Sequence, residues 1–436
     1  MTETAADQRD VEPRTTCAYP KCAVPIVSQG AFFLCRDAEC RRSHVACPQC
    51  GSANRAHALH CTRCGGELDY DDAVARDADR FEFSVPLGTL LREQTRAFCI
   101  PLEDPQPVSR LVLNGYLFVV HKDRQRRHGH DYRLLIADPR TGNTVAERGL
   151  PAYIVGHPVM HRRHPALIAT RGRIFKLDLT TLALSPLCDV PEVGWKFAQM
   201  PVFGDRWYVV VGDADSRAFS VYWLSDENGA MQKVVDLQSE PEMAVVHDRK
   251  VVLLCGKGGV IVSKQGVRQL PKWPEPPNEE VGEGSIAYGR GLVFFATDSR
   301  VACFDVESFD AAFVSNLTHQ GNAKLTVAGD VLYVADGSGL RSVRISSRYS
   351  GVPPKTLSKR PFATRVLPFG RYVAGVLDGG NLMVLDGETG AEIAAKRFHR
   401  LTRPPTYFNG CLYVLSDTED GLGGELNAFR LTSNGK

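Results

Sequence analysis

Residues 325–336 read LTVAGDVLYVAD and residues 367–378 read LPFGRYVAGVLD, each a short apolar strand, a turn with glycine and a second apolar strand. The same arrangement recurs six more times after residue 108, with turns near positions 114, 162, 204, 248, 290 and 409. The eight copies follow one another at a mean step of about 42 residues, and a third strand follows each copy. No stretch has the 3.6-residue periodicity of a long helix. The pattern therefore predicts an all-β chain folded as an eight-bladed β-propeller with four strands in each blade.

Two of the copies carry the pattern most completely, LLIADPRTGNTVAE at 134–147 and MVLDGETGAEIAA at 383–395. This sequence of strand, turn, strand, Leu-Asp and Thr-Gly resembles the PQQ-like (quinoprotein-type, WD40-like) repeat propellers, over residues 81–436. The resemblance implies a fold and is diagnostic of no single activity. The copy at 151–185 is the weakest, so seven blades remain an alternative to eight.

The last copy ends at ELNAFRLTSNGK and lacks the outermost strand that the other copies have. An open ring would leave two exposed sheet edges. Residues 81–102, FEFSVPLGTLLREQTRAFCIPL, precede the first copy and contain FEFSVPL, which alternates as a strand does. We expect this segment to supply the missing outer strand and to close the ring.

Residues 47–68, CPQCGSANRAHALHCTRCGGEL, hold two Cys-x-x-Cys pairs separated by ten residues. Each pair places two sulfurs on one side of a tight turn, and four thiolates close a tetrahedral site of the structural kind. The pattern resembles the double zinc ribbon family in CPQCGSAN and CTRCGGEL. Four further cysteines precede it with wider spacing, in CAYPKC and CRDAEC. The predicted ligands of two zinc ions are Cys17, Cys22, Cys35, Cys40, Cys47, Cys50, Cys61 and Cys64.

How these ligands pair is left open by the spacing. Sequential sets of four are expected, but an interleaved arrangement is compatible with the sequence. His44, His57 and His60 lie nearby and could replace a sulfur, or they are solvated surface residues. The segment has too few large apolar side chains to fold by burial alone, so the zinc is expected to act as a structural staple.

The resulting domain organisation has four parts. Residues 1–16 are expected to be a disordered N-terminus, 17–68 the double zinc-binding module, 69–80 a charged linker, and 81–436 the propeller. The chain begins without an apolar signal segment and has no apolar run long enough to span a bilayer, which favours a cytoplasmic protein without membrane attachment. The formal net charge of +2 argues against bulk nucleic acid as a partner. The other five cysteines, mostly in apolar stretches, are interpreted as small buried side chains.

Turns between the first and second and between the third and fourth strands of a blade lie on one face of a propeller, and the remaining connections lie on the other. By this rule four longer connections share one face: 121–131 (HKDRQRRHGHD), 212–219, 271–284 with Trp273, and 416–424 (SDTEDGLGG). We expect them, together with the zinc head, to bind protein partners, because binding residues concentrate in loops on a rigid scaffold. The basic loop 121–131 and the acidic loop 416–424 could instead only neutralise each other. The basic stretch MHRRH (160–164) falls on the opposite face.

No catalytic constellation is evident in the sequence. The four tryptophans do not follow the repeat, and no signal peptide or vicinal cysteine pair is present, so we expect no quinone cofactor. The function favoured is a non-enzymatic protein-binding adaptor or scaffold. Two alternatives stay open: a nucleic-acid- or ribosome-associated regulatory factor acting through the zinc head, and a hydrolase that uses the central pocket of the propeller.

Overall fold

The computed structural model describes four short strands between residues 26 and 55 and, with gaps, residues 91–431. The larger gaps are 93–95, 107–111, 123–131, 155–158, 191–195, 214–217, 271–284 and 346–352. The chain divides into two compact units, Met1–Arg80 and Phe81–Lys436. Within the described residues all regular structure is β-strand, and none of it is a helix that could cross a membrane.

The first unit contains one antiparallel sheet of four strands in chain order. Its strands are β1 (Ile26–Gln29), β2 (Phe32–Cys35), β3 (Ser43–Ala46) and β4 (Ala53–Arg55). Cys35 ends β2 and pairs with Ile26 at the start of β1. The other seven predicted zinc ligands, Cys17, Cys22, Cys40, Cys47, Cys50, Cys61 and Cys64, lie outside the described residues, as do residues 1–16 and the linker 69–80.

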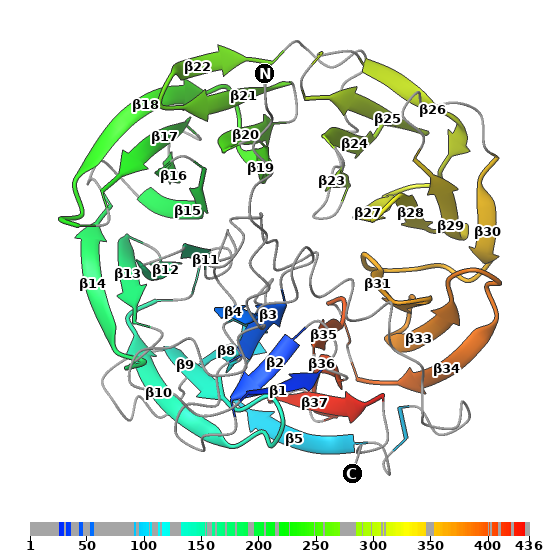
Figure 1. Ribbon diagram of the computed structural model, residues 1–436. Helices are drawn as coiled ribbons and strands as arrows, with labels where there is room; N and C mark the ends of the chain where they lie inside the picture. The colour runs from blue at the N-terminus through cyan, green and yellow to red at the C-terminus, as the bar shows by residue number, and fades with distance from the viewer. Residues whose placement is uncertain are drawn as a thin grey trace, which may run out of the picture. The chain divides into compact units, whose positions relative to one another are not determined.

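The second unit is a closed ring of eight blades, as the sequence predicts (Figure 1). Seven blades have the four strands expected, and blade 1 has five because two short strands share the inner position. Blade 1 has β6 (Pro105–Gln106) and β7 (Val112–Leu113), both paired with β8 (Tyr116–Lys122), then β9 (Tyr132–Ala137) and β10 (Thr144–Leu150). Blade 2 has β11 (Val159–His161), β12 (His164–Thr170), β13 (Arg173–Leu177) and β14 (Leu184–Asp189). Blade 3 has β15 (Lys196–Phe203), β16 (Trp207–Asp213), β17 (Ala218–Leu224) and β18 (Met231–Leu237). Blade 4 has β19 (Pro241–His247), β20 (Lys250–Cys255), β21 (Gly258–Ser263) and β22 (Gly266–Gln269).

The second half of the ring repeats the same order. Blade 5 has β23 (Ile286–Gly289), β24 (Leu292–Ala296), β25 (Arg300–Asp305) and β26 (Ala311–Thr318). Blade 6 has β27 (Lys324–Ala328), β28 (Val331–Asp336), β29 (Gly339–Arg344) and β30 (Lys355–Ser358). Blade 7 has β31 (Leu367–Phe369), β32 (Tyr372–Val376), β33 (Asn381–Asp386) and β34 (Glu392–Arg397). Blade 8 has β35 (Thr406–Phe408), β36 (Cys411–Asp417), β37 (Gly424–Arg430) and β5 (Arg96–Leu102).

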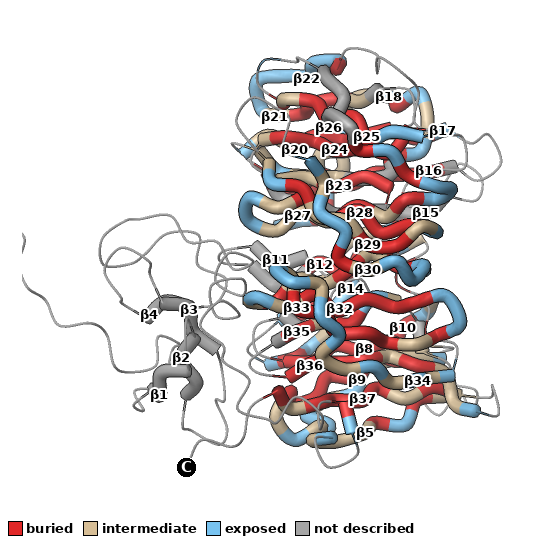
Figure 2. Tube along the Cα trace, turned by 90° about the vertical axis from the view of Figure 1, so that its right-hand side faces the viewer, coloured by how far each residue is buried: buried red, intermediate tan, exposed pale blue. Residues whose placement is uncertain are grey.

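The eight repeated turns of the sequence are the eight turns between the first and second strands, and the alternative of seven blades is wrong. The second strands are buried on both faces, as in β8, β24 and β28, because each blade packs between two others. Outer strands such as β14 and β34 alternate between exposed and half-buried residues. Figure 2 shows this distribution, with buried residues along the strands and exposed residues at many of the turns.

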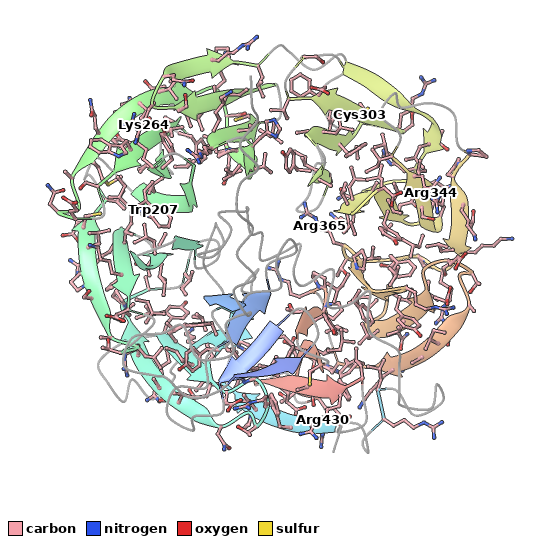
Figure 3. All side chains as sticks on the ribbon, in the orientation of Figure 1. Trp207, Lys264, Cys303, Arg344, Arg365 and Arg430 are labelled. Atoms are coloured by element: carbon pink, nitrogen blue, oxygen red, sulfur yellow. The ribbon has the colours of Figure 1, made fainter. Side chains whose placement is uncertain are left out.

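The core consists of apolar clusters between neighbouring blades. In one cluster Phe118 of blade 1 packs with Ile168 of blade 2, and in the next Leu167 of blade 2 packs with Trp207 of blade 3. Four further clusters continue around the ring to blade 7, and Cys303 belongs to the one between blades 5 and 6. Figure 3 shows these side chains filling the spaces between blades. The ring is held together by burial at every interface, which is the dominant favourable term in folding.

Residues 96–102, within the segment 81–102 from which we expect the closing strand, form the outer strand of blade 8. β5 pairs with β37 in antiparallel register, from Leu102 opposite Gly424 to Phe98 opposite Ala428. FEFSVPL (81–87), whose alternation suggested the strand, lies outside the described residues. Tyr413 of blade 8 also donates a hydrogen bond of 2.7 Å from its hydroxyl to the carbonyl oxygen of Pro139 in blade 1.

The aspartate at the end of the third strand has a structural role. Asp138 accepts a 2.8 Å hydrogen bond from the amide of Arg140, Asp178 a 3.0 Å bond from that of Thr181, and Asp305 a 2.9 Å bond from that of Ser308. Such side-chain bonds to the following backbone stabilise turns. The repeated aspartates that mark the copies in the sequence therefore cap the turns between third and fourth strands.

Candidate functional site

The strand order determines the face on which each connection lies. The connections β8–β9, β16–β17 and β36–β37 join second to third strands, and β22–β23 joins one blade to the next. The strand ends that flank these connections therefore lie on one face of the ring, which we call the docking face. The predicted loops 121–131, 212–219, 271–284 and 416–424 stand at these positions in the chain, and the ends of three of them belong to the flanking strands. Most of their residues, including Trp273, lie outside the described residues.

The ends of two of these loops are described. His121 is half-buried at the end of β8, and burial lowers its pKa. In the acidic loop, the amide of Thr418 donates to the carbonyl of Gly423 at 3.0 Å, and the amide of Gly423 donates to the hydroxyl of Thr418 at 3.0 Å. The ring brings blades 1 and 8 side by side, as expected, so β8 and β36, which precede the basic and the acidic loop, belong to neighbouring blades (Figure 1).

The stretch MHRRH spans the end of β11, a first strand, and the start of β12, a second strand, and residues 162 and 163 between them lie outside the described residues. It therefore belongs to the face opposite the docking face, in agreement with the sequence-based assignment. The turns on this opposite face join first to second strands and third to fourth strands in every blade.

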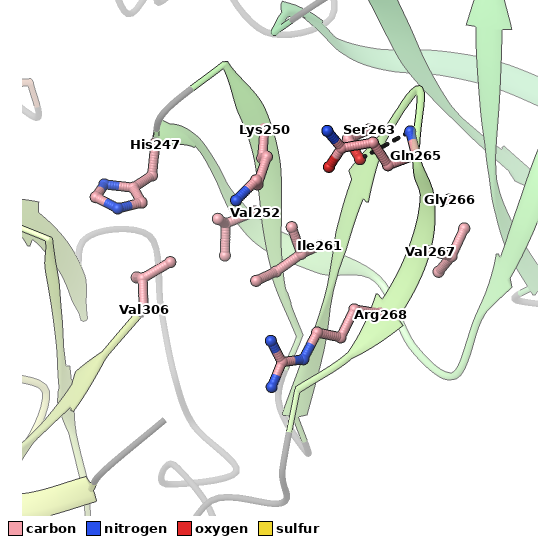
Figure 4. Close-up of a pocket in the computed structure, with 10 residues that line it drawn as sticks. All are labelled: His247, Lys250, Val252, Ile261, Ser263, Gln265, Gly266, Val267, Arg268 and Val306. Carbon is pink, nitrogen blue, oxygen red and sulfur yellow. Dashed lines mark hydrogen bonds between the residues drawn. The ribbon is translucent and has the colours of Figure 1, made fainter. Parts of the chain in front are cut away.

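A groove between blades 4 and 5, which we call the basic groove, was not predicted from the sequence. It has a volume of about 390 Å³, at the lower end of the range typical of ligand pockets. Three basic residues line it: His247, Lys250 and Arg268. The nitrogen-bearing ends of their side chains lie around Val252 and Ile261, as Figure 4 shows. No acidic residue is among the described residues that line the groove.

The strand register explains why these side chains come together. Val252 of β20 pairs with Ile261 of β21, which in turn pairs with Arg268 of β22, so the three form one cross-strand row. Lys250 is two residues before Val252 and Ser263 two residues after Ile261, which places them on the same face of the sheet. The face is directed at blade 5, because Val252 and Ile261 belong to the cluster between blades 4 and 5.

Blade 5 supplies the other side of the groove. Val306, which follows β25 and is buried, lines it. The ring of His247 lies edge-on to that of Tyr288 of β23, with Nδ1 2.7 Å from the tyrosine hydroxyl. A Cβ on Gly291 would lie 3.5 Å from Cε1 of His247, so this turn of blade 5 also packs closely against the imidazole. The orientation of His247 is thus fixed from the neighbouring blade.

The groove lies toward the face opposite the docking face. His247 and Lys250 flank the turn between β19 and β20, and Ser263 and Gly266 flank the turn between β21 and β22. Val306 begins the connection between the third and fourth strands of blade 5. The sequence carried a signal for this site, since the turns HDRK (247–250) and SKQGVR (263–268) are both basic and share a face under the strand-order rule.

Two further polar side chains of the ring, Asp336 and Arg365, have structural roles. Asp336, fully buried, accepts hydrogen bonds from the amides of Ser338 at 2.7 Å and Gln320 at 3.1 Å and pairs with Arg341. Arg365, on the inner side of the ring in Figure 3, donates from Nη2 to the carbonyl of Ile286 at 2.6 Å. The bonds of Asp336 hold a turn of blade 6 and the connection that precedes this blade, and the bond of Arg365 joins the connection between blades 6 and 7 to blade 5.

The cysteines outside the head are placed largely as predicted. Cys255, Cys303 and Cys411 are buried, whereas Cys99 and Cys188 are half-buried. Burial raises the pKa of Cys188 to about 11, and Asp189 adds to the effect. Its thiol is therefore protonated at neutral pH. Among the described residues no cluster of three or more histidine, cysteine or acidic side chains could hold a metal ion.

Comparison with known proteins supports the architecture. No family model matches the chain, and no curated protein matches it. Among solved structures, the computationally designed protein Ika8 matches with a TM-score of 0.53 and 14% identity, over 79% of this chain and 99% of that chain. BamB from Moraxella catarrhalis matches with a TM-score of 0.49 and 16% identity, over 77% of this chain and 99% of that chain. At such identities the likeness to Ika8 shows the propeller fold alone.

Proposed function

We propose that this protein is a non-enzymatic scaffold of the cytoplasm that binds protein partners through the docking face of its propeller. The observation that supports the proposal is the strand order, which assigns the connections β8–β9, β16–β17, β22–β23 and β36–β37 to one face of the ring. One of them, 121–131, holds four Lys or Arg residues, and 416–424 holds three acidic residues. Rigid display of charged loops is the arrangement that protein recognition commonly uses, because it steers partners and lowers the entropic cost of binding.

The zinc-bound head is the second part of the proposal. The predicted ligands Cys47 and Cys50 lie in the connection between β3 and β4, whose ends are paired through Ala46 and Ala53. A Cys-x-x-Cys pair in a hairpin connection is the arrangement that a zinc ribbon requires. Cys35 at the end of β2 has Cys40 five residues after it, in the connection to β3. We therefore propose two structural zinc ions in this unit, each bound by four thiolates.

Quantitative recovery of partners from cells tests the scaffold function. The full-length tagged chain is compared with a variant in which Arg124, Arg126 and Arg127 of the loop 121–131 are changed to serine. The matched control changes Arg162 and Arg163 to serine, because these arginines lie in a turn of the opposite face. We expect the first variant to lose a set of partners that the wild type and the control retain.

Two results would contradict the proposal. The first is that no protein is recovered in a stable amount with the wild-type chain. The second is that both variants lose the same partners, which would mean that positive charge matters and the docking face does not. Recovery of nucleic acid that disappears steeply with rising salt would favour the alternative of a nucleic-acid-associated factor, because released counterions give such binding its salt dependence.

A further inference from the structure

The basic groove combines two features that select one kind of ligand. Apolar residues line its floor, and of these Ile261 offers the most surface, since it is 8% exposed while Val306 and Val252 are 4% and 0% exposed. Its rim is positively charged, with Lys250 half-buried and Arg268 exposed. Apolar surface favours a hydrocarbon group, and lysine and arginine favour a carboxylate or another anion beside it. The ligand must therefore present a negative charge within a few ångströms of an apolar side chain.

The shape of blade 4 indicates that this ligand is an extended peptide. β22 (Gly266–Gln269) is the outer strand of the blade, and all four of its residues are exposed. Within the described sheet no strand lies on its outer side, so its edge presents main-chain groups that a peptide can pair with. Val267 of this strand is 39% exposed and lines the groove. An extended segment along β22 would place alternate side chains over the groove.

We infer that the basic groove binds a short segment of a partner protein in which an acidic residue stands next to apolar ones. The inference rests on the proposed scaffold function and gives it a second surface, on the face opposite the docking face. The carboxylate pairs with Lys250 and Arg268, while an apolar side chain contacts Ile261. His247, oriented by Tyr288, forms the wall of the groove on the side of blade 5.

Binding of labelled octapeptides to the full-length chain, followed by fluorescence anisotropy, tests the inference. The probe peptide has glutamate flanked by leucine and valine. In one comparison peptide glutamine replaces the glutamate, and in another serine replaces the apolar residues. We expect the probe to bind and both comparison peptides to bind at least about tenfold more weakly, since each lacks one of the two required features.

Variants of the protein locate the binding. Lys250→Gln and Arg268→Gln are each expected to weaken binding about three- to tenfold, because each removes one partly solvated ion pair. Arg249→Gln and Lys264→Gln are the matched controls, since both cations are exposed on the same two turns and neither lines the groove. The controls are expected to bind the probe as the wild type does.

Three outcomes would overturn the inference. The first is that the probe does not bind below roughly 1 mM, and the second is that the groove variants and the control variants lose equal amounts of affinity for the probe. The third is that butanoate displaces the labelled probe as effectively as unlabelled probe peptide does, which would indicate a small-anion site. Failure here is distinguishable from failure of the scaffold function. If partners are still recovered through the docking face while the peptides do not bind, the groove inference alone is wrong. If the peptides bind while no partner is recovered, the scaffold function is wrong.

Discussion

Gly142→Ala tests whether the contact between blades 8 and 1 closes the ring as tightly as the structure indicates. Gly142 lies in the turn between β9 and β10 with φ of 73°, and its amide donates to the carbonyl of Asp138 at 2.8 Å. A Cβ at this position would lie 2.5 Å from Cδ2 and 2.7 Å from Cγ of Phe98, on the closing strand β5. The substitution therefore carries two separate costs, one in the backbone and one in the packing.

The two costs have different magnitudes and can be measured separately. The left-handed backbone conformation costs an alanine about 1–2 kcal/mol, and forcing a methyl group against the phenylalanine ring adds about 1–3 kcal/mol. Gly172 has φ of 79°, and a methyl group at this position would have no neighbouring atom within 4 Å, so Gly172→Ala isolates the backbone cost. We expect Gly142→Ala to lower the free energy of unfolding by about 2–5 kcal/mol, clearly more than Gly172→Ala.

Denaturant unfolding followed by tryptophan fluorescence measures both variants, because all four tryptophans lie between residues 195 and 273 and report on the propeller alone. Phe98→Ala removes the obstructing ring. In the double variant with Gly142→Ala, we expect the loss of stability to be smaller than the sum of the single losses by about the packing cost, 1–3 kcal/mol. Equal effects of Gly142→Ala and Gly172→Ala, or additive effects in the double variant, would refute the packing of β5 on blade 1.

Three further predictions concern single groups. Tyr413→Phe should lower the free energy of unfolding by about 1–3 kcal/mol in the same assay, because it leaves the buried carbonyl of Pro139 without its hydrogen bond; no measurable loss would contradict this. Burial alone would raise the pKa of Asp386, but hydrogen bonds from the backbone and from an arginine outweigh burial and lower the pKa to about 2. The carboxylate therefore stabilises the fold above the unfolded-state pKa of about 4, and this stabilisation is lost as the pH falls toward about 2. The difference in free energy of unfolding between the wild type and Asp386→Asn, measured at several pH values, should shrink over that interval. Elemental analysis should find two zinc ions per chain, and chelation or Cys47→Ser should make the head sensitive to proteolysis while tryptophan fluorescence stays unchanged; a metal-free head resistant to protease would refute the staple.

The propeller was predictable because its signal is local and repeated. Each copy contains its own turn and its own apolar strand pair, and each aspartate such as Asp138 or Asp305 caps a turn within a few residues of itself. Eight weak signals at one spacing reinforce one another. The closing segment was predictable for a different reason, since a ring that lacks one outer strand must obtain it from the other end of the chain.

The contacts that complete the closure could not be predicted in the same way. Tyr413 and Pro139 are far apart in the chain, and nothing in either local sequence indicates that hydroxyl and carbonyl meet. The clash that a side chain at Gly142 would meet depends on the register between β5 and β37, which shifts between Ala428 and Phe429. Register of this kind is determined by tertiary packing, which local sequence patterns do not contain.

The strand order predicts which residues of the basic groove share a face, but it does not predict that a groove is present. The order alone places the turns of Lys250 and Ser263 on one face, and strand alternation places Val252 and Ile261 beneath them. Whether a groove remains there depends on the neighbouring blade, because a larger side chain at Val306 would fill the same space. A basic turn in a sequence therefore identifies a candidate surface, and the volume left by the next blade decides whether that surface can bind.

Two surfaces on opposite faces of one ring have a consequence for the proposed scaffold. The docking face is formed by connections between second and third strands and between blades, whereas the basic groove lies toward the turns of the other kind. No loop belongs to both, so a segment bound along β22 leaves the connections 121–131 and 416–424 accessible. The strands between the two faces are packed on both sides by apolar clusters and change little on binding. Occupancy of one surface should therefore leave affinity at the other nearly unchanged, and a protein whose two surfaces bind independently can hold two partners at once without requiring that either arrive first.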